Sequence, residues 1–336
     1  MRGFFQFIFV SFFWLPQAYG FAFLSEFVSK NGNDIRYEES GLSSDEIKHP
    51  KWKNSPVNIV LCTGGTAIQN TKLRQSNGNL VLTDSEWKQK ILADLNDAIS
   101  SWNSSTLGSA VSLGTATANS SCGPNMGQTY GGNDGVNQIF FNSVYDDGVD
   151  LPRGVLGFTL LSLEVQDGEL VIVDADVILN AMNYNDYVNG DYYDPAGILT
   201  HELGHFFGIA HSLVSDDNSS DETLTSATMY PKVIGNGSYL IALAYDDVIA
   251  LQNLYPSTNE GGILRGAVFN HEGAPLRGAQ VSVFSLQENS SILENTSITA
   301  AISGLSQTRT STDGSFEIRA LPLNINFIVF VEPIER

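Results

Sequence analysis

The chain has 336 residues, of which 42% are hydrophobic and 16% are charged, so it can form a folded core and is not a disordered protein. Acidic residues outnumber basic ones by 37 to 17, which excludes a nucleic-acid-binding protein because such a surface repels phosphates. Two cysteines are too few for a disulfide-dense miniprotein or for a zinc module with four thiolates. The length predicts two domains.

Residues 1–20 have the pattern of an export signal peptide. Arg2 precedes an apolar run that ends at Pro16, and small residues follow at Ala18 and Gly20, as signal cleavage requires. The run is shorter than the ~20 residues that a membrane span needs, although a retained anchor is the alternative interpretation. We therefore expect a secreted, extracellular or periplasmic protein that has no stable membrane span after the signal is removed.

Export makes a disulfide chemically permissible, because disulfides persist in oxidising compartments. Cys62 and Cys122 are the two cysteines of the chain. Their pairing would close a loop of about 60 residues and stabilise the fold by about 4 kcal/mol. The alternative is two separate buried thiols.

The elements expected after the signal peptide begin with a polar stretch, 21–55, which predicts an arm or a short pro-segment. Globular patterning begins at Pro56, with a strand over 56–62. Thr83 and Glu86 form a capping-box pattern before a helix whose apolar residues share one face: Trp87, Ile91, Leu95, Ala98, Ile99 and Trp102. Strands are then expected over 136–141, 155–163 and 169–180, and helices from Pro195 and over 244–255.

The strongest functional signal is His201-Glu-Leu-Gly-His205, followed by Gly208 and His211. On a helix, His201 and His205 lie on one face about 6 Å apart along the axis, so both imidazoles can reach one metal ion. Gly208 accepts the left-handed conformation that ends the helix in a sharp turn, and the turn brings His211 back as a third ligand. Three histidines leave the fourth position of a tetrahedral zinc ion for water, as in catalytic sites.

Glu202 follows the first predicted ligand and cannot point at the metal in the same way. It is placed to act as the general base that takes a proton from the bound water. The alternatives are a helix with incidental surface histidines and a metal site that has lost catalysis. The intact Glu202 argues against the second alternative.

The complete motif resembles the HExxHxxGxxH signature of the metzincin zinc peptidases. Those enzymes also have a methionine turn after the motif, and Met229 within Ser-Ala-Thr-Met-Tyr-Pro at 226–231 fits that position. The pairs His211-Ser212 and Met229-Tyr230 are most similar to the matrixin branch, the matrix-metalloproteinase type. The resemblance implies that Met229 forms a hydrophobic floor under the metal and is not a ligand.

The segment 245–255, with its paired aspartates and terminal Leu-Tyr, is similar to the final helix of the matrixins. The resemblance covers about 56–256 and implies an α+β fold of zincin type, with a twisted mixed sheet and about three helices. It also implies a zinc-dependent endopeptidase that acts on protein or peptide substrates.

An extended substrate should pair with an edge strand of the sheet, and Glu169–Asn180 is the strand that we expect at the edge. This requirement favours flexible protein segments as substrates. The alternative function is a non-catalytic binding or adhesion protein on the same scaffold, in which the C-terminal domain makes the contact.

A calcium ion is a further expectation, because aspartates offer the oxygen ligands that calcium prefers. They do not form an EF-hand pattern, so the residues are only candidates: Asp146, Asp147, Asp150, Asp186, Asp191 and Asp194. An acidic insertion over 215–222 would favour basic substrates, or it is simply a solvated loop.

The composition changes after Pro256, where 257–262 is predicted to be a linker. Beyond it, apolar and polar residues alternate as in strands. The runs 263–269, 273–281 and 312–316, followed by Leu321-Pro322, resemble the carboxypeptidase regulatory-like domain over about 262–333. The resemblance implies that 263–336 is a small all-β sandwich of transthyretin-like type that serves as a spacer or attaches to a surface or another protein. Any other β-sandwich with glycine turns is the alternative, and the short stretch after 325–331 leaves an incomplete sandwich open.

Overall fold

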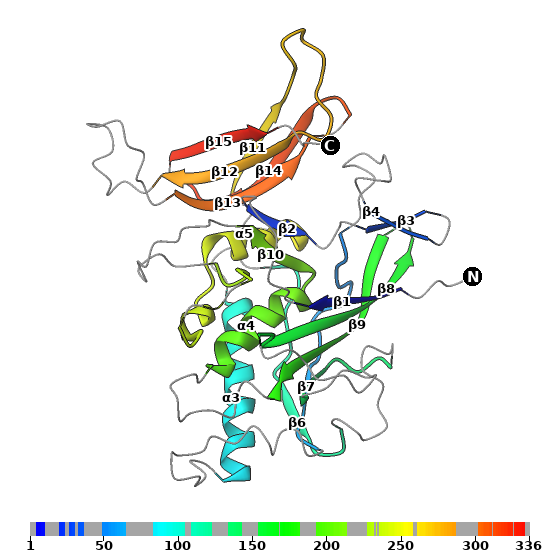
Figure 1. The fold of residues 1–336 in the computed structure, drawn as a ribbon, viewed down its shortest axis with the longest axis vertical. Helices are drawn as coiled ribbons and strands as arrows, with labels where there is room; N and C mark the ends of the chain where they lie inside the picture. Colours follow the sequence, from blue (N-terminus) through cyan, green and yellow to red (C-terminus); the bar gives the residue numbers. More distant parts are fainter. Residues whose placement is uncertain are drawn as a thin grey trace.

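The structure is a computed structural model of the full chain. It describes residues 5–10, 20–23, 27–30, 33–36, 49–64, 83–104, 109–122, 134–142, 154–167, 169–181, 193–213, 227–231, 233, 235–257, 261–286, 302–310, 312–324 and 326–332. These residues form a mixed sheet, three α-helices and a group of C-terminal strands (Figure 1). Among the described residues, no helix is both long and apolar enough to cross a membrane.

The central sheet has six strands in the order β1-β8-β9-β7-β5-β6. The strands are β1 (Phe5–Val10), β5 (Val60–Cys62), β6 (Thr117–Asn119), β7 (Gln138–Asn142), β8 (Gly157–Gln166) and β9 (Glu169–Asn180). β6, β5, β7 and β9 pair in parallel, whereas β8 is antiparallel to β9 and to β1. The sheet is therefore mixed, and its antiparallel part is the β8–β9 hairpin.

The expectation that Glu169–Asn180 lies at the edge of the sheet is wrong. β9 pairs with β7 on one side and with β8 on the other. Ten residues from Val171 to Asn180 include nine that are buried, which is the pattern of an internal strand covered on both faces. The outer neighbour of β9 is β8, and β8 in turn pairs with β1, which belongs to the predicted signal segment 1–20.

The helix α3 (Asp84–Asn103) begins where the capping-box pattern predicts. The Thr83 backbone N–H donates to Glu86 Oε2 at 2.7 Å, and the Glu86 N–H donates to Thr83 Oγ1 at 3.3 Å. The predicted apolar face of α3 is buried, and its residues are Trp87, Ile91, Leu95, Ala98, Ile99 and Trp102. The Trp102 indole donates to the Thr200 carbonyl at 2.8 Å, which connects α3 to the next helix.

The helix α4 (Pro195–Phe206) carries two of the three predicted metal ligands, His201 and His205, and is buried along its whole length. Asp194 caps it, because its Oδ1 accepts from the Ala196 N–H at 3.1 Å. The core beneath it is formed by α3, the inner face of the sheet and the helix α5 (Tyr245–Leu254). α4 thus packs against α3, against the strands β8 and β9 of the sheet, and against the short 3₁₀ helix η3 (Ser238–Ile241).

The far end of α4 is fixed by two aromatic side chains from distant parts of the chain. The Trp52 indole donates to the Phe206 carbonyl at 2.8 Å, and the Tyr255 hydroxyl donates to the Phe207 carbonyl at 2.7 Å. The Tyr255 hydroxyl also accepts from the Trp52 N–H at 3.0 Å. Carbonyls at a helix C-terminus have no partner within the helix, so these side chains satisfy them.

Cys62 and Cys122 form a disulfide. The disulfide belongs to a small buried cluster with Phe140, Phe158 and Ile178. The neighbouring residues along the same strands belong to the main core, so this cluster lies on the other face of the sheet.

The chain before residue 49 contributes three short strands besides β1. β2 (Gly20–Phe23) pairs with β10 (Ile209–Leu213), and β3 (Phe27–Lys30) pairs with β4 (Asn33–Arg36). In the described end of the predicted arm, 49–55, Pro50 and Trp52 are buried, whereas Lys53, Asn54 and Ser55 are exposed.

The described residues after 257 contain strands and turns without a helix. β11 (Gly262–Ala267) pairs with β14 (Ser315–Leu321), and β12 (Gln280–Leu286) lies between β13 (Ile302–Arg309) and β15 (Asn326–Glu332). β13 and β14 contact α5, and the Asn253 side chain donates to the Arg319 carbonyl at 3.3 Å. These strands therefore pack on the end of the molecule formed by α5 (Figure 1).

Candidate metal centre

α4 places His201 and His205 one turn apart, with their ring centroids separated by 4.9 Å. Both side chains are buried, with 7% and 2% of their surface exposed. The four-residue spacing predicted this arrangement, because residues four apart lie on one face of a helix.

The helix ends at Phe206, and the chain turns away from it at Gly208, which has a φ of +91°. The Gly208 N–H donates to the His205 carbonyl at 2.8 Å, so the chain turns directly after the second histidine. A side chain at this position would also meet the Pro50 carbonyl oxygen at less than any ordinary contact distance. Glycine is therefore required here both by the backbone conformation and by the close approach of the segment around Pro50.

The turn leads into β10, which carries His211 back to the helix. The Nε2 atoms of His205 and His211 are 3.2 Å apart. One ligand nitrogen from each of His201, His205 and His211 lies within 4.8 Å of the other two. The structure thus brings the three predicted metal ligands together.

Hydrogen bonds orient two of the rings. Nδ1 of His201 is 2.6 Å from the Thr228 carbonyl, and Nδ1 of His205 is 2.8 Å from the Ile209 carbonyl. Because a carbonyl oxygen only accepts, both Nδ1 atoms carry the proton, and each Nε2 keeps its lone pair for a metal. This is the arrangement that metal-binding histidines normally have.

Burial keeps the three imidazoles neutral. It lowers the pKa of His201 to about 4, and together with the neighbouring His201 it lowers the pKa of His211 to about 3. The pKa of His205 is also well below its ordinary value, for the same reason. Neutral imidazoles with converging lone pairs fit a zinc ion, because only the deprotonated ring binds metal.

Glu202 points toward the sheet and has 1% of its surface exposed. Its Oε2 accepts a hydrogen bond of 2.8 Å from the Thr159 hydroxyl on β8. Burial raises the pKa of Glu202 to about 8, while the hydrogen bond from Thr159 opposes that shift. The carboxyl group therefore binds a proton more tightly than an exposed glutamate does, as suits a group that takes up and returns a proton.

Met229 is fully buried beside α4. A side chain on Gly204 would collide with the Met229 sulfur, so the glycine between the two histidines lets the methionine approach the helix. The Met229 N–H donates to Asp247 Oδ1 at 3.1 Å, and the N–H groups of Thr228 and Ala244 donate to Oδ2, each at 2.9 Å. Asp247 on α5 thus fixes the segment whose Thr228 carbonyl orients His201.

Several residues that support these side chains were not predicted as site residues from the sequence. They are Thr159, Gly204, Asp247 and also Gly157 on β8, where a Cβ atom would lie 2.9 Å from Glu202 Oε1. The paired aspartates at 246–247 were a signal for Asp247, but its role as a backbone anchor is visible only in three dimensions. Gly204 lies inside the motif itself. No sequence pattern pointed to Gly157 or Thr159.

The calcium candidates Asp146, Asp147, Asp150, Asp186 and Asp191 lie outside the described residues, as does the acidic segment 215–222. Asp194 is described, and its carboxylate caps α4. A different aspartate, Asp174 on β9, is buried in the sheet with 1% of its surface exposed. Burial, and then the neighbouring carboxylates of Asp176 and Asp134, raise its pKa to about 8.

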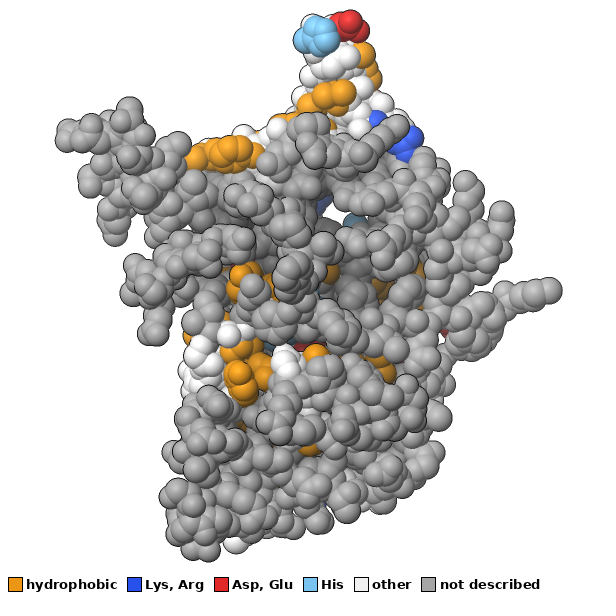
Figure 2. All heavy atoms as spheres, in the orientation of Figure 1, with side chains coloured by type: hydrophobic (Ala, Val, Ile, Leu, Met, Phe, Trp, Pro, Cys, Tyr) orange, Lys and Arg blue, Asp and Glu red, His pale blue; other side chains and the backbone are white. Residues whose placement is uncertain are grey.

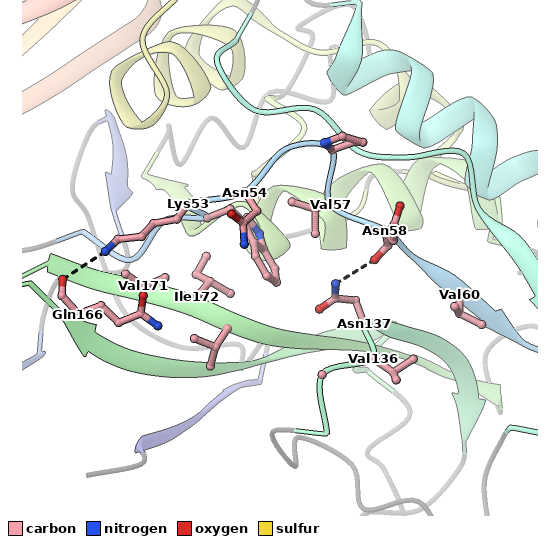
Figure 3. A pocket seen from close by; sticks show the side chains of 14 residues that line it. Lys53, Asn54, Val57, Asn58, Val60, Val136, Asn137, Gln166, Val171 and Ile172 are labelled. Atoms are coloured by element: carbon pink, nitrogen blue, oxygen red, sulfur yellow. Dashed lines mark hydrogen bonds between the residues drawn. The ribbon is translucent and has the colours of Figure 1, made fainter. Parts of the chain in front are cut away.

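A pocket of about 350 Å³ lies between the segment 52–60 and the strands β8 and β9 (Figure 3). Its lining is rich in amides, and the Asn137 side chain donates to the Asn58 carbonyl at 2.9 Å. The Lys53 ammonium group donates to the Gln166 carbonyl at 3.4 Å. None of the predicted site residues lines this pocket, so it is separate from the histidine cluster.

Comparisons with known proteins point in the same direction as the geometry. No protein-family model matches the chain. A stretch of 116 residues is 30% identical to Metalloendoproteinase 4-MMP of Arabidopsis thaliana. The match covers 34% of this chain and 30% of the length of that relative. The chain therefore contains a region similar to a matrix metalloproteinase, and its three clustered histidines fit a zinc site.

Proposed function

We propose that the chain is an exported zinc-dependent endopeptidase of the matrixin type. The observation that carries this proposal is the convergence of three neutral histidines next to a buried Glu202. The similarity to a plant metalloendoproteinase supports it independently.

In this proposal, His201, His205 and His211 hold the metal through their Nε2 atoms. A zinc ion bound there would polarise the scissile carbonyl and lower the pKa of a water molecule toward ~7. Glu202 takes a proton from that water and returns it to the leaving amine. Its Oε1 accepts no hydrogen bond from the described residues, so this oxygen is the one available for the proton.

The substrate would lie extended along the sheet, as in other strand-addition complexes. Because β9 is an internal strand, the strand that would pair with the substrate is β8. β8 carries Thr159, which lies beside Glu202. In the full chain the outer edge of β8 pairs with β1. Since β1 lies within the predicted signal peptide, removal of residues 1–20 on export would leave that edge free for a substrate.

The proposed organisation keeps the boundaries expected from the sequence: a signal peptide over 1–20, an arm or pro-segment over 21–55, a peptidase domain over 56–256 and a linker over 257–262. Residues 263–336 would form the transthyretin-like β-sandwich. The antiparallel strands β11 to β15 support an all-β arrangement there.

The alternative proposal is a binding or adhesion protein on the same scaffold. It is favoured by exposed hydrophobic residues on the C-terminal strands and turns, some of which are visible in Figure 2. The large ones are Ile263, Phe269, Leu276, Leu323, Val329, Phe330 and Val331. Such residues suit contact with a surface or another protein.

The two proposals differ in the effect of Glu202→Gln. In an endopeptidase, this change should lower the cleavage of an unfolded protein by at least about 100-fold, while the zinc content stays near one ion per chain. Glu272→Gln is the matched control, because Glu272 is exposed in the C-terminal region. A wild-type protein that holds zinc but cleaves no peptide in a diverse library would contradict the endopeptidase and support the adhesion protein.

A further inference from the structure

Thr159 connects the sheet to the proposed general base. It is fully buried on β8, and its hydroxyl lies 2.8 Å from Glu202 Oε2 and 3.1 Å from the Glu202 backbone oxygen. A hydroxyl has a single proton to donate, and both of these acceptors belong to the same residue. Thr159 therefore contacts Glu202 at its backbone and at its carboxylate.

Gly157 lies two residues earlier on the same face of β8, because side chains alternate along a strand. A Cβ atom on Gly157 would be 2.9 Å from Glu202 Oε1 and 3.2 Å from its Cδ. The missing side chain thus leaves room for the Glu202 carboxylate. We call the space bounded by Gly157 and Thr159 the β8 niche.

The β8 niche acts on a side chain that the helix alone does not fix. α4 determines where the Glu202 backbone lies, but the side chain still has three rotatable bonds. β8 is a firm support, since it pairs with β9 over its whole length and Thr159 itself pairs with Val177. Among the described residues, Thr159 is the donor that holds the Glu202 carboxylate by a side-chain hydrogen bond.

We propose that Thr159 and Gly157 are positioning residues that hold the Glu202 carboxylate in one orientation for proton transfer. The proposal rests on the endopeptidase function proposed above. A catalytic group must be held within about 0.5 Å of its productive position by its surroundings. Loss of the β8 niche should therefore slow the chemical step more than it weakens substrate binding.

The test uses the zinc-loaded protein, expressed as the full chain, with four variants. Thr159→Val keeps the shape of the side chain and removes the hydroxyl, Thr159→Ser keeps the hydroxyl, and Gly157→Ala crowds Oε1. Thr200→Val is the matched control, because Thr200 is equally buried in α4 but donates only to the Ala196 carbonyl, at 2.7 Å. Each protein is assayed for kcat, KM and zinc content, and its Glu202 conformation is determined by crystallography.

Thr159→Val and Gly157→Ala should lower kcat by about tenfold to 100-fold with KM changed less than about twofold. Thr159→Ser should recover most of the loss, and Thr200→Val should resemble wild type. Crystals of Thr159→Val should show the Glu202 carboxylate in a different or in several orientations, with zinc still at one ion per chain.

The proposal is overturned if Thr159→Val keeps the wild-type kcat, if Thr159→Ser is as slow as Thr159→Val, or if zinc is lost in parallel with activity. Failure of the endopeptidase proposal has a different signature, since the wild type itself would then cleave nothing. In that case the Glu202 conformation still decides the matter, because an unchanged carboxylate in Thr159→Val crystals would refute the positioning role.

Discussion

The Asp247 carboxylate on α5 accepts a hydrogen bond of 3.1 Å from the backbone N–H of Met229. The same carboxylate accepts from the N–H groups of Thr228 and Ala244. Asp247 thus replaces missing backbone partners in the segment that lies under α4 and orients His201. A carboxylate on the later helix α5 therefore supports the candidate metal centre.

Asp247→Ala should lower the free energy of unfolding by about 3 kcal/mol or more, because it leaves three N–H groups without an acceptor. Urea unfolding of the two proteins measures this difference. Asp97→Asn, at an exposed position on α3, should change the stability by less than about 0.5 kcal/mol. Equal effects of the two substitutions would contradict the anchoring role of Asp247.

Gly208→Ala should destabilise the protein by more than about 2 kcal/mol and weaken zinc binding, because it disturbs the turn that delivers His211. Gly135→Ala is a matched control, since Gly135 also has a positive φ, of +75°, but nothing lies within 4 Å of a Cβ built there. That control should cost only about 1 kcal/mol for the left-handed backbone. Thermal unfolding and zinc titration separate the two effects, and similar losses in both variants would show that the contact with Pro50 is unimportant.

Replacing Cys62 and Cys122 together by serine should lower the free energy of unfolding by about 2–4 kcal/mol, because the disulfide restricts the unfolded chain. Reduction of the wild type before unfolding should produce a loss of the same size. Mass spectrometry without reductant checks the bond itself. A free-thiol mass in the exported wild type would contradict the disulfide.

Asp174 predicts a specific pH dependence of stability. Its folded pKa of about 8 lies above the ordinary value of 3.8, so the folded state binds its proton more tightly than the unfolded state. The resulting stabilisation is complete below about pH 4 and is lost as the pH rises through about 8, by at most about 1.4 kcal/mol per pH unit. Asp174→Asn should therefore lose less stability than wild type between pH 5 and pH 8.

Urea unfolding at the two pH values checks this prediction, with Asp97→Asn as the control that should follow the wild type. If Asp174→Asn and wild type lose the same free energy over this range, Asp174 does not carry the raised pKa.

The parts of the fold that the sequence predicts well are those set by local patterns. The apolar spacing of α3 and its capping box predict the buried face and the first residue of that helix, and the spacing of the three histidines around Gly208 predicts that they come together. These features depend on residues within one or two turns of each other, so a single stretch of sequence contains the whole cause.

The features that could not be predicted depend on neighbours far away in the chain. β9 lies in the middle of the sheet because it pairs with β7 as well as with β8. β7 is a neighbour of β9 in the sheet, but in the sequence the whole of β8 lies between them. The hydrogen bond between Thr159 and Glu202 likewise joins a strand and a helix that are 43 residues apart. The composition of Glu169–Asn180 suits an edge strand or an internal strand, so it did not indicate which of the two β9 is. Threonine is common in strands, so Thr159 gave no sign of its contact with Glu202.

The contacts that Trp52 and Tyr255 make at the end of α4 set practical limits on any shortened version of the protein. Trp52 donates a hydrogen bond to the Phe206 carbonyl, and Tyr255 donates one to the Phe207 carbonyl. The Trp52 backbone N–H also donates to the Tyr255 hydroxyl. A fragment that starts at Pro56, or one that stops before Tyr255, would expose those carbonyls directly after His205, the second candidate metal ligand. The smallest fragment that keeps the end of α4 intact must therefore begin no later than Trp52 and extend at least to Tyr255.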